Sequence, residues 1–195
     1  RDPGFYKSIR EKVLPVLATY PQINIWHAGC STGEEVFSLC ILLHEVGLLH
    51  RTRIYATDIN ASYLEKARTG VLPMTHMREY TLNYLQSGCT GDFSDYYTAL
   101  YDHVLIHREI RERVVFLQHN LVTDRSFNEF QLILCRNVMI YFNKQLQNKV
   151  LKLFHESLSS LGFIGLGMKE SLLFSEYRSK YSVVDGSVKI FRKKS

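Results

Sequence analysis

The residues best suited to binding or catalysis in this sequence stand at four separate places. The first is a glycine-rich loop, Gly29-Cys30-Ser31-Thr32-Gly33, which Glu34 and Glu35 follow at once. The other three are Asp58, the pair Asn120-Leu121 and the pair Arg136-Asn137, and each comes shortly after an apolar run. If these apolar runs are strands of one open α/β sheet, all four places face one crevice at the carboxyl ends of the strands.

The two carboxylates behind the glycine loop indicate what kind of ligand it holds. The spacing Gly29-x-x-x-Gly33 differs from the dinucleotide fingerprint G-x-G-x-x-G, and the loop lacks the Lys-Ser/Thr pair of a phosphate-binding P-loop. Glu34 and Glu35 would repel a pyrophosphate and attract a cationic group. S-adenosylmethionine carries an ammonium and a sulfonium, so it suits this loop better than NAD or ATP.

Asp58 has two interpretations, as a ligand contact or as the cap of the helix that follows it. It stands 29 residues after Gly29, at the end of the second apolar run. A carboxylate at that point can accept hydrogen bonds from both ribose hydroxyls of an adenosine. The combination with the glycine loop favours the ligand interpretation.

The elements that position these residues alternate between strands and helices. Apolar runs predict strands at 23–28, 53–57, 114–117, 130–135 and 163–168. Helices are predicted behind the glycine loop, where apolar residues recur at i, i+3, i+4 and i+7, and at about 61–68 and about 144–161. Gly70 and Gly162 are expected to end the last two helices. Asp185-Gly186 predicts a C-terminal β-hairpin. Successive strand–helix units favour a parallel sheet in an α/β fold.

Two segments depart from this alternation. Residues 73–112 are the expected insertion or subdomain, with a helix near 76–86 followed by a loop and a strand or two. At the other end, Asp2-Pro3 predicts the start of a helix, with Asp2 as the N-cap. Arg1 would lie just outside that helix, and we expect a further N-terminal portion before it.

Composition narrows the function classes. The chain has 195 residues, of which 46% are hydrophobic and 22% charged, as expected for one globular domain. Its four cysteines form no C-x-x-C pair, which argues against a zinc site and a disulfide framework. No apolar run approaches the ~18 residues of a membrane span. We therefore expect a cytoplasmic protein without a metal. The net charge of +5 favours acidic partners, although the basic residues are scattered.

Longer strings around the same positions resemble one family. Gly29-Cys30-Ser31-Thr32-Gly33-Glu34-Glu35, Ala56-Thr57-Asp58-Ile59, Asn120-Leu121 and Cys135-Arg136-Asn137-Val138-Met139-Ile140-Tyr141-Phe142 resemble the bacterial chemotaxis receptor methyltransferases (CheR). The opening Arg1-Asp2-Pro3 and the late string from Gly167 to Leu172 match as well. The resemblance covers almost the whole chain and is weakest between about 80 and 112. The string from Cys135 to Phe142 is its most specific part.

The resemblance implies a fold, an activity and a partner. The fold would be the Rossmann-like class I methyltransferase fold, a mostly parallel sheet with helices on both faces and a C-terminal antiparallel hairpin. The activity would be methyl transfer from S-adenosylmethionine to glutamate side chains, giving methyl esters and S-adenosylhomocysteine. The partner would be the glutamate-rich helical cytoplasmic domain of a receptor or another signalling protein. We expect a monomer that binds no nucleic acid and does not insert into a membrane, and the family's helical N-terminal domain would precede Arg1.

The resemblance also implies roles for individual residues. Glu35 would hold the methionine ammonium and Asp58 the ribose. The remaining cofactor contacts would be Gly29, Ser31 and Gly33 in the loop, Asn120 and Leu121 beside the adenine, and Arg136 and Asn137 near the methionyl end. Arg1 and Tyr141 would lie beside the methyl group and the incoming carboxylate, as the catalytic residues.

The same residues also allow other interpretations. Arg136 could pair with a surface carboxylate, and the pattern alone places Tyr141 in the hydrophobic core. Many relatives have Pro-Tyr where this chain has Val36-Phe37, and Ser where it has Lys169, so a non-catalytic module that binds S-adenosylmethionine is a second hypothesis. The pI of about 9.0 prompts a third, an RNA methyltransferase. Arg136-Asn137-Val138 stands where such enzymes often carry an Asn/Asp-Pro-Pro-aromatic motif, which argues against it.

Overall fold

A seven-stranded sheet forms the centre of the structure, a computed structural model that describes residues 2–173 and 175–195. Its strand order is β6-β2-β1-β7-β8-β10-β9. The bounds are β1 (Ile23–Ala28), β2 (Thr52–Asp58), β6 (Val114–Gln118), β7 (Phe130–Cys135), β8 (Leu158–Leu166), β9 (Tyr181–Asp185) and β10 (Ile190–Lys193). The first five run parallel, and β10 is antiparallel to both β8 and β9. The predicted α/β fold with a mostly parallel sheet and a C-terminal hairpin is confirmed.

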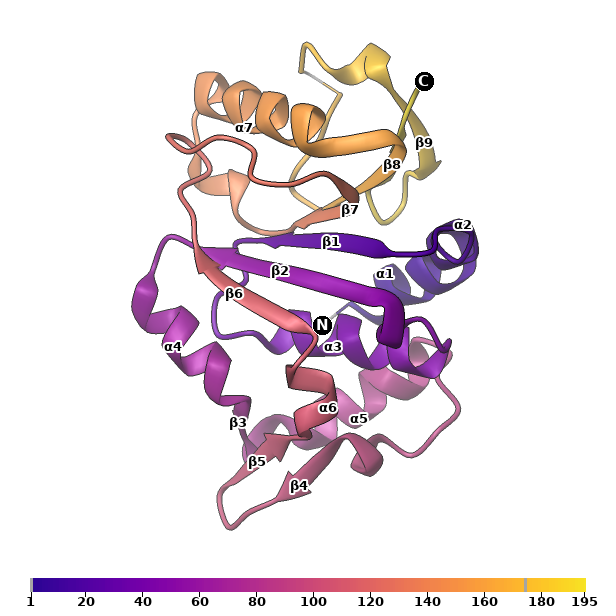
Figure 1. The fold of residues 1–195 in the computed structure, drawn as a ribbon, viewed down its shortest axis with the longest axis vertical. Coiled ribbons are helices and arrows are strands. Elements are labelled where there is room, and N and C mark those ends of the chain that lie inside the picture. The colour runs from indigo at the N-terminus through magenta and orange to yellow at the C-terminus, as the bar shows by residue number, and fades with distance from the viewer. Residues whose placement is uncertain (1, 174) are drawn as a thin grey trace.

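Helices cover both faces of this sheet (Figure 1). Their bounds are α1 (Pro3–Ser8), α2 (Leu14–Leu17), α3 (Glu34–Glu45), α4 (Ala61–Thr69), α5 (Met77–Gln86), α6 (Arg108–Arg111) and α7 (Lys144–Ser157), and a π-helical turn at Ile9–Val13 joins α1 to α2. In Figure 1, α7 lies on one side of the sheet, whereas α3 and α4 lie on the other. None of the helices in the described part of the chain is long and apolar enough to cross a membrane.

Strand alternation in β1 sends side chains into two separate cores. Ile25 belongs to the core on the α3 side, where it joins Leu39 of that helix. Its neighbour Trp26 belongs to the core on the α7 side, where it joins Phe154. Because successive side chains of a strand point to opposite faces, a fully buried strand must be apolar on both. This burial explains why β1 and β7 are largely apolar.

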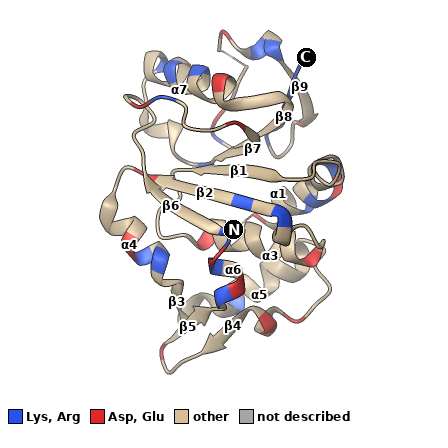
Figure 2. Ribbon diagram, viewed as in Figure 1, with Lys and Arg blue, Asp and Glu red and all other residues tan. Residues whose placement is uncertain are grey.

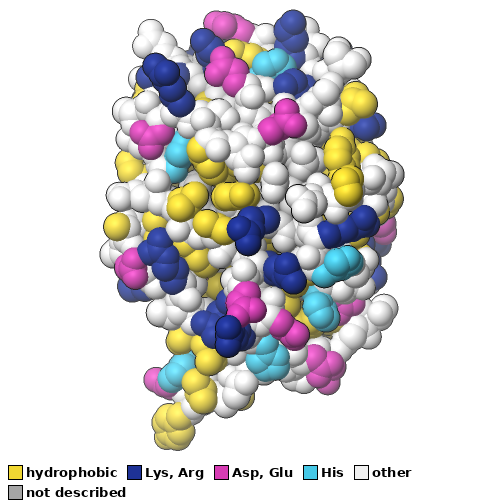
Figure 3. All heavy atoms as spheres, viewed as in Figure 1, with side chains coloured by type: hydrophobic (Ala, Val, Ile, Leu, Met, Phe, Trp, Pro, Cys, Tyr) yellow, Lys and Arg dark blue, Asp and Glu magenta, His cyan; other side chains and the backbone are white. Residues whose placement is uncertain are grey.

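A small antiparallel sheet lies beyond α3 and α5. It has the order β3-β5-β4, with β3 (Val71–Pro73), β4 (Tyr97–Ala99) and β5 (His103–Ile106). Hydrophobic side chains project from its tip in Figure 3, where the β4–β5 connection carries the exposed Leu100 and Tyr101. The same view shows basic and acidic side chains interspersed over this face of the molecule. That this segment is an insertion in the fold stays a prediction.

Two predicted boundaries near the C-terminus are wrong. The helix predicted to run to residue 161 ends at Ser157, because Leu158 already pairs with Phe130 of β7. Residues 159–162 then bulge, and pairing resumes at Phe163 opposite Leu132. The strand extends to Leu166 rather than 168. Apolar periodicity cannot detect this boundary, since the tertiary pairing that captures Leu158 is remote in sequence.

The C-terminal hairpin forms around a longer turn than Asp-Gly predicts. Ile190 pairs with Asp185, so four residues, 186–189, connect the strands. Positive φ occurs at Lys189, at 62°, and not at Gly186. The Asp185 carboxylate accepts hydrogen bonds from the backbone amide and hydroxyl of Ser187 at 3.1 and 2.6 Å. These bonds stabilise the wider turn.

Candidate functional site

A cleft of about 730 Å³ lies at the carboxyl ends of β1, β2, β6 and β7. Of the predicted site residues, those that line it are Gly29, Ser31, Glu35, Asp58, Asn120, Leu121, Arg136, Asn137 and Tyr141. The structure therefore brings all four strand-end groups to one crevice. Gly33 does not line the cleft, and Arg1 lies outside the described residues. A cleft of this size holds a ligand of cofactor dimensions.

The glycine loop is shaped by backbone requirements at its two ends. Gly29 has φ of 77°, and its amide donates to the carbonyl of Thr57 at 2.8 Å. A Cβ at this position would lie 2.2 Å from Cγ2 of Val138, so only glycine lets the loop pack against the segment after β7. Gly33 has φ of 92° and serves as the N-cap of α3. Its contribution is to start α3, which places Glu34 and Glu35 at the cleft.

Asp58 does not cap the helix that follows it. The N-cap of α4 is Asn60, whose side chain accepts a hydrogen bond from the Ser62 amide. Asp58 instead joins two loops, since Oδ2 accepts from the Ser31 amide and Oδ1 from the Asn60 amide, both at 2.9 Å. Each carboxylate oxygen has two lone pairs, so both retain a free acceptor site. The capping interpretation is therefore wrong.

Arg136 is the buried cation of the cleft, with only 7% of its surface exposed. It forms ion pairs with Glu35 and, at 2.8 Å, with Asp2. Its guanidinium also lies 4.0 Å from the centre of the Phe5 ring, a cation–π contact. The two carboxylates that pair with Arg136 therefore stand at the start of α1 and at the start of α3. Its Nε is buried without a partner among the described residues.

Tyr141 lies at the rim of the cleft and not in the hydrophobic core. It ends a short 3₁₀ helix, Met139–Tyr141, and 81% of its surface is exposed. The core interpretation that the sequence pattern favours is therefore wrong. Nearby, Gln147 of α7 donates from its side-chain amide to the carbonyls of Met139 and Phe142, both at 3.0 Å. These bonds attach the Tyr141 segment to a stable helix.

Glu170 holds the same segment from the other side, a role that no sequence pattern indicates. Its buried carboxylate accepts hydrogen bonds from the backbone amides of Asn137, Val138 and Met139 at 3.0, 2.8 and 2.7 Å. A fourth comes from the Gly167 amide at 2.6 Å. Four amide donors satisfy a carboxylate that would otherwise be costly to bury. No local pattern distinguishes such a glutamate from one on the surface.

Apolar side chains line the end of the cleft near β6 beside the polar His119 and Asn120, and the sequence pattern does not indicate two of them. Leu121 is buried, whereas Ile59 is 62% exposed and Tyr63 is also exposed, and all three line the cleft. Asn120 turns the backbone here, because its side-chain oxygen accepts from the Val122 amide at 2.9 Å. An exposed apolar side chain at a cleft indicates a ligand with an apolar face.

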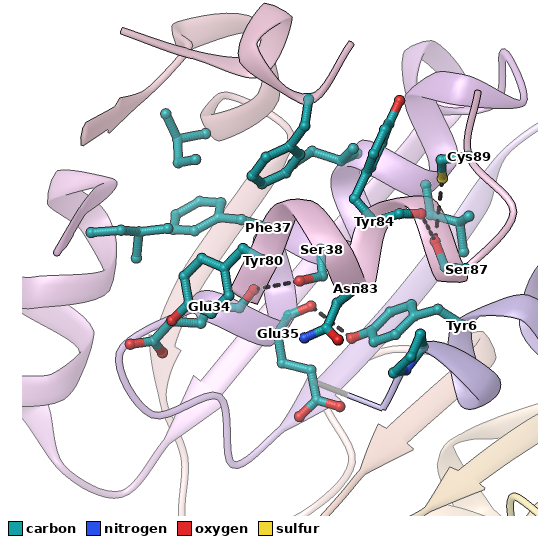
Figure 4. Close-up of a pocket in the computed structure, with 16 residues that line it drawn as sticks. Tyr6, Glu34, Glu35, Phe37, Ser38, Tyr80, Asn83, Tyr84, Ser87 and Cys89 are labelled. Carbon is teal, nitrogen blue, oxygen red and sulfur yellow. Dashed lines mark hydrogen bonds between the residues drawn. The ribbon is translucent and has the colours of Figure 1, made fainter. Parts of the chain in front are cut away.

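A second cavity behind α3 is much smaller, at about 60 Å³ (Figure 4). The Tyr6 hydroxyl donates to the backbone carbonyl of Glu35 at 3.0 Å, and the Ser38 hydroxyl to that of Glu34 at 2.9 Å. In Figure 4 the Glu35 carboxylate points away from Ser38 and the cavity above it. Val36 and Phe37 are buried in the core on this side. The cavity therefore belongs to the packing of α3 against α1, α5 and the small sheet.

The cysteines near the cleft are unsuited to nucleophilic chemistry. Burial raises the pKa of the Cys30 thiol to about 12, and the negative charge of Asp58 adds to this effect. Burial likewise raises the pKa of Cys135 well above its usual value. Both thiols stay protonated at neutral pH, whereas the reactive form is the thiolate. Among the described residues, no group of three or more His, Cys, Asp or Glu side chains is placed to hold a metal ion.

Comparison with known proteins identifies the family of this chain. The sequence model of the family described as "CheR methyltransferase, SAM binding domain" matches residues 1–190. Over 193 residues, which make up 99% of this chain and 71% of the relative, the chain is 51% identical to Cher3 of Pseudomonas putida, described as a candidate methyltransferase. It is 33% identical over 179 residues to a chemotaxis protein methyltransferase of Vibrio parahaemolyticus, covering 88% of this chain and 63% of the relative.

The structure also resembles a solved methyltransferase. The TehB-like SAM-dependent methyltransferase from Corynebacterium glutamicum matches with a TM-score of 0.51 over 96% of this chain and 85% of that chain. The two sequences are 12% identical, so this likeness concerns the fold. The Rossmann-like methyltransferase fold is confirmed.

The chain is also 30% identical over 185 residues to a chemotaxis protein methyltransferase of Borreliella burgdorferi, and the match covers 62% of that protein. The chain thus spans less than two thirds of these chemotaxis relatives.

Proposed function

Because the chain belongs to the CheR methyltransferase family and forms its S-adenosylmethionine-binding domain, we propose that it methylates glutamate side chains of a chemoreceptor or a similar signalling protein. It is a methyltransferase that uses S-adenosylmethionine. The proposal of a protein glutamate as the acceptor rests on one observation above all. The loop that carries Arg136 and the exposed Tyr141 forms the rim of the cleft, where a side chain from another protein can enter.

The charged groups of the cleft fit the amino-acid end of the cofactor. Glu35 and Arg136 lie side by side as an ion pair, so a bound ammonium has a carboxylate partner and a bound carboxylate has a guanidinium partner. Asp58 retains acceptor sites for two hydroxyls, and Leu121 and Ile59 offer apolar surface for an adenine. We assign the cofactor contacts accordingly, with Gly29, Ser31, Asn120 and Asn137 completing the set.

The proposed reaction needs little acid–base chemistry from the protein. S-adenosylmethionine supplies an electrophilic methyl group on a sulfonium, whose transfer to a carboxylate oxygen yields a methyl ester and S-adenosylhomocysteine. A glutamate side chain has a pKa of about 4.3 and is ionised at neutral pH, so no general base is required. The chain's own residues have to align the carboxylate and exclude water from the cleft.

Two residues are proposed to act on the incoming carboxylate. The hydroxyl of Tyr141 can donate to one carboxylate oxygen, and its exposed position at the rim supports that role. Arg1 is proposed from the family resemblance, and its sequence neighbour Asp2 is ion-paired with Arg136. An arginine orients a carboxylate through its planar guanidinium. A substrate in a receptor's cytoplasmic domain would place the reaction in the cytoplasm.

Transfer of a labelled methyl group tests the proposal. The protein is incubated with S-adenosylmethionine labelled in the methyl group and with purified cytoplasmic fragments of chemoreceptors. We expect label on the receptor that mild base releases as methanol, because methyl esters hydrolyse under conditions that leave methylated amines and methylated nucleobases intact. Receptors that remain free of ester at saturating cofactor would contradict the proposal and favour a non-catalytic cofactor-binding module.

A further inference from the structure

A second hollow, of about 520 Å³, lies beside the cofactor cleft. Its lining comes from α7, from the segment after β8 and from the loop after β7, and the residues are Met139, Lys144, Gln147, Asn148, Leu151, Lys169, Glu170, Ser171 and Ser175. The cofactor cleft is lined by Val138, Tyr141 and Phe142 of the same loop that gives Met139 to this hollow. The segment 138–142 is therefore a wall shared by the two. We refer to the hollow of about 520 Å³ as the Lys144–Lys169 hollow.

The lining of the Lys144–Lys169 hollow carries a net positive charge, from two lysines and one buried glutamate. Lys144 and Lys169 are both exposed, and neither forms a hydrogen bond or an ion pair through its side chain within residues 2–173 and 175–195. The acidic residue in the described lining is Glu170, whose carboxylate already accepts four backbone hydrogen bonds. Basic residues recur along α7 in Figure 2. A ligand that enters here meets two ammonium groups and no free carboxylate.

The other side chains of the hollow suit a carboxylate. Asn148 is half-buried in the lining and offers amide donors. Gln147 contributes its stem, because its amide is already bonded to Met139 and Phe142. Leu151 is buried and closes the floor. Lysine ammonium groups around a partly polar hollow favour an acidic side chain over a neutral or basic one.

We propose that the Lys144–Lys169 hollow binds a second acidic side chain of the substrate protein, next to the glutamate that enters the cofactor cleft. This inference rests on the proposed function and extends it to substrate selection. In a helical substrate, residues three or four positions apart lie on one face. A helix that presents one glutamate to Tyr141 can then present a neighbouring acidic residue across the shared wall. The enzyme would thus prefer glutamates that have an acidic neighbour at i±3 or i±4.

The test compares two double variants that remove the same charge. Lys144→Gln/Lys169→Gln removes both ammonium groups of the hollow. Lys66→Gln/Lys149→Gln is the matched control, because both of these lysines are exposed and lie outside the hollow, the second on α7 itself. Steady-state methylation of a receptor cytoplasmic fragment gives KM and kcat for each protein, at low and at high salt. Calorimetry gives the affinity for S-adenosylhomocysteine.

We expect the hollow variant to raise KM for the receptor about 5- to 20-fold with kcat and S-adenosylhomocysteine affinity unchanged. The control should change KM less than about twofold. Wild-type KM should rise with salt, and the salt effect should be weaker in the hollow variant, since screening acts on charge pairs. An unchanged KM in the hollow variant, or an equal change in both variants, would overturn the inference.

A binding measurement separates this inference from the proposed function. A fluorescein-labelled helical peptide with glutamates at i and i+4 is titrated with the protein in the presence of S-adenosylhomocysteine, and its glutamine counterpart and a single-stranded RNA are titrated in parallel. Tighter binding of the acidic peptide, lost in the hollow variant but not in the control, supports the inference even if no ester forms on a receptor. Binding that is equal for both peptides, or RNA binding that depends on Lys144 and Lys169, would overturn it.

Discussion

The carboxylate of Glu170 accepts a hydrogen bond from the backbone amide of Asn137 at 3.0 Å. The same carboxylate accepts from Val138 and Met139, so one side chain after β8 fixes the backbone that follows β7. Asn137 itself has a positive φ of 59°, a conformation that a non-glycine residue keeps only with support. The geometry of the cofactor cleft therefore depends on a residue that does not line it.

Replacing Glu170 by glutamine tests this dependence. Glu170→Gln keeps the size of the side chain, but an NH₂ group would face amide donors where an acceptor oxygen now stands. We expect the free energy of unfolding to fall by about 2–3 kcal/mol, the scale for hydrogen bonds to a charged group. Urea denaturation measures this, with Glu176→Gln, an exposed glutamate, as the control.

A positioning role predicts more than lost stability. At a temperature where Glu170→Gln is fully folded, S-adenosylhomocysteine should bind at least several-fold more weakly, because Arg136 and Asn137 are held less firmly. Wild-type affinity in a folded but destabilised variant would mean that Glu170 serves stability alone.

Asp58 should contribute directly to cofactor affinity. Asp58→Ala removes the acceptors proposed for the ribose together with the bonds to Ser31 and Asn60. We expect weaker S-adenosylmethionine binding by on the order of 1.5–3 kcal/mol. Calorimetry measures the change, and Asp95→Ala, an exposed aspartate outside the cleft, is the matched control. An unchanged affinity in Asp58→Ala would remove Asp58 from the cofactor site.

Tyr141 should affect turnover more than binding. Tyr141→Phe removes only a hydroxyl at a position that is 81% exposed, so folding should be unaffected. If the hydroxyl acts in the transition state, kcat falls by roughly 10- to 100-fold, about 1.4–2.7 kcal/mol, while cofactor affinity is retained. Tyr101→Phe, at the exposed tip of the small sheet, is the control. Full activity in Tyr141→Phe would leave the residue as part of the cleft rim without a catalytic role.

Asp185 makes stability depend on acid pH. Its carboxylate is ion-paired with Lys12 at 2.6 Å and accepts from the Ser8 hydroxyl at 2.8 Å. The Lys12 bond, with those of Ser187 and Ser8, holds the pKa of Asp185 well below its usual range. Because the folded pKa is depressed, this stabilisation is complete above the unfolded pKa of about 3.9 and is lost as pH falls toward the folded value.

The matching variant is Asp185→Asn. We expect it to be about 1 kcal/mol less stable than wild type at pH 7, since the pair lies partly exposed. The difference should shrink as the pH is lowered below about 4. Denaturation curves across this range measure it. A difference that stays constant with pH would show that the charge of Asp185 contributes nothing.

The parts of the fold that local sequence predicts are those with local causes. Asp2 caps α1 and Pro3 begins it, and Gly70 ends α4 with φ of 66°. Apolar runs give the parallel strands, and the polar residues at their ends meet because parallel strands share one carboxyl edge. The same reasoning predicts that Asp58 and Arg136 lie at one cleft, and both line it.

The parts that the sequence did not predict have long-range causes. Helix α7 ends at Ser157 because Leu158 pairs with Phe130, a residue 28 positions earlier. Glu170 is buried because three amides of the remote segment 137–139 converge on it together with the nearby Gly167 amide, whereas a glutamate in isolation is expected at the surface. Tyr141 is exposed because its loop turns outward, which the surrounding apolar residues do not indicate.

The central claim is that this cleft transfers a methyl group to a protein glutamate. The most direct measurement is tandem mass spectrometry of a receptor cytoplasmic fragment incubated with the protein and S-adenosylmethionine carrying a deuterated methyl group. We predict the heavy methyl group on glutamate side chains, removed by mild base, and strongly reduced with Asp58→Ala. Heavy methyl groups on lysine, arginine or added RNA, or an unlabelled receptor at saturating cofactor, would contradict the claim.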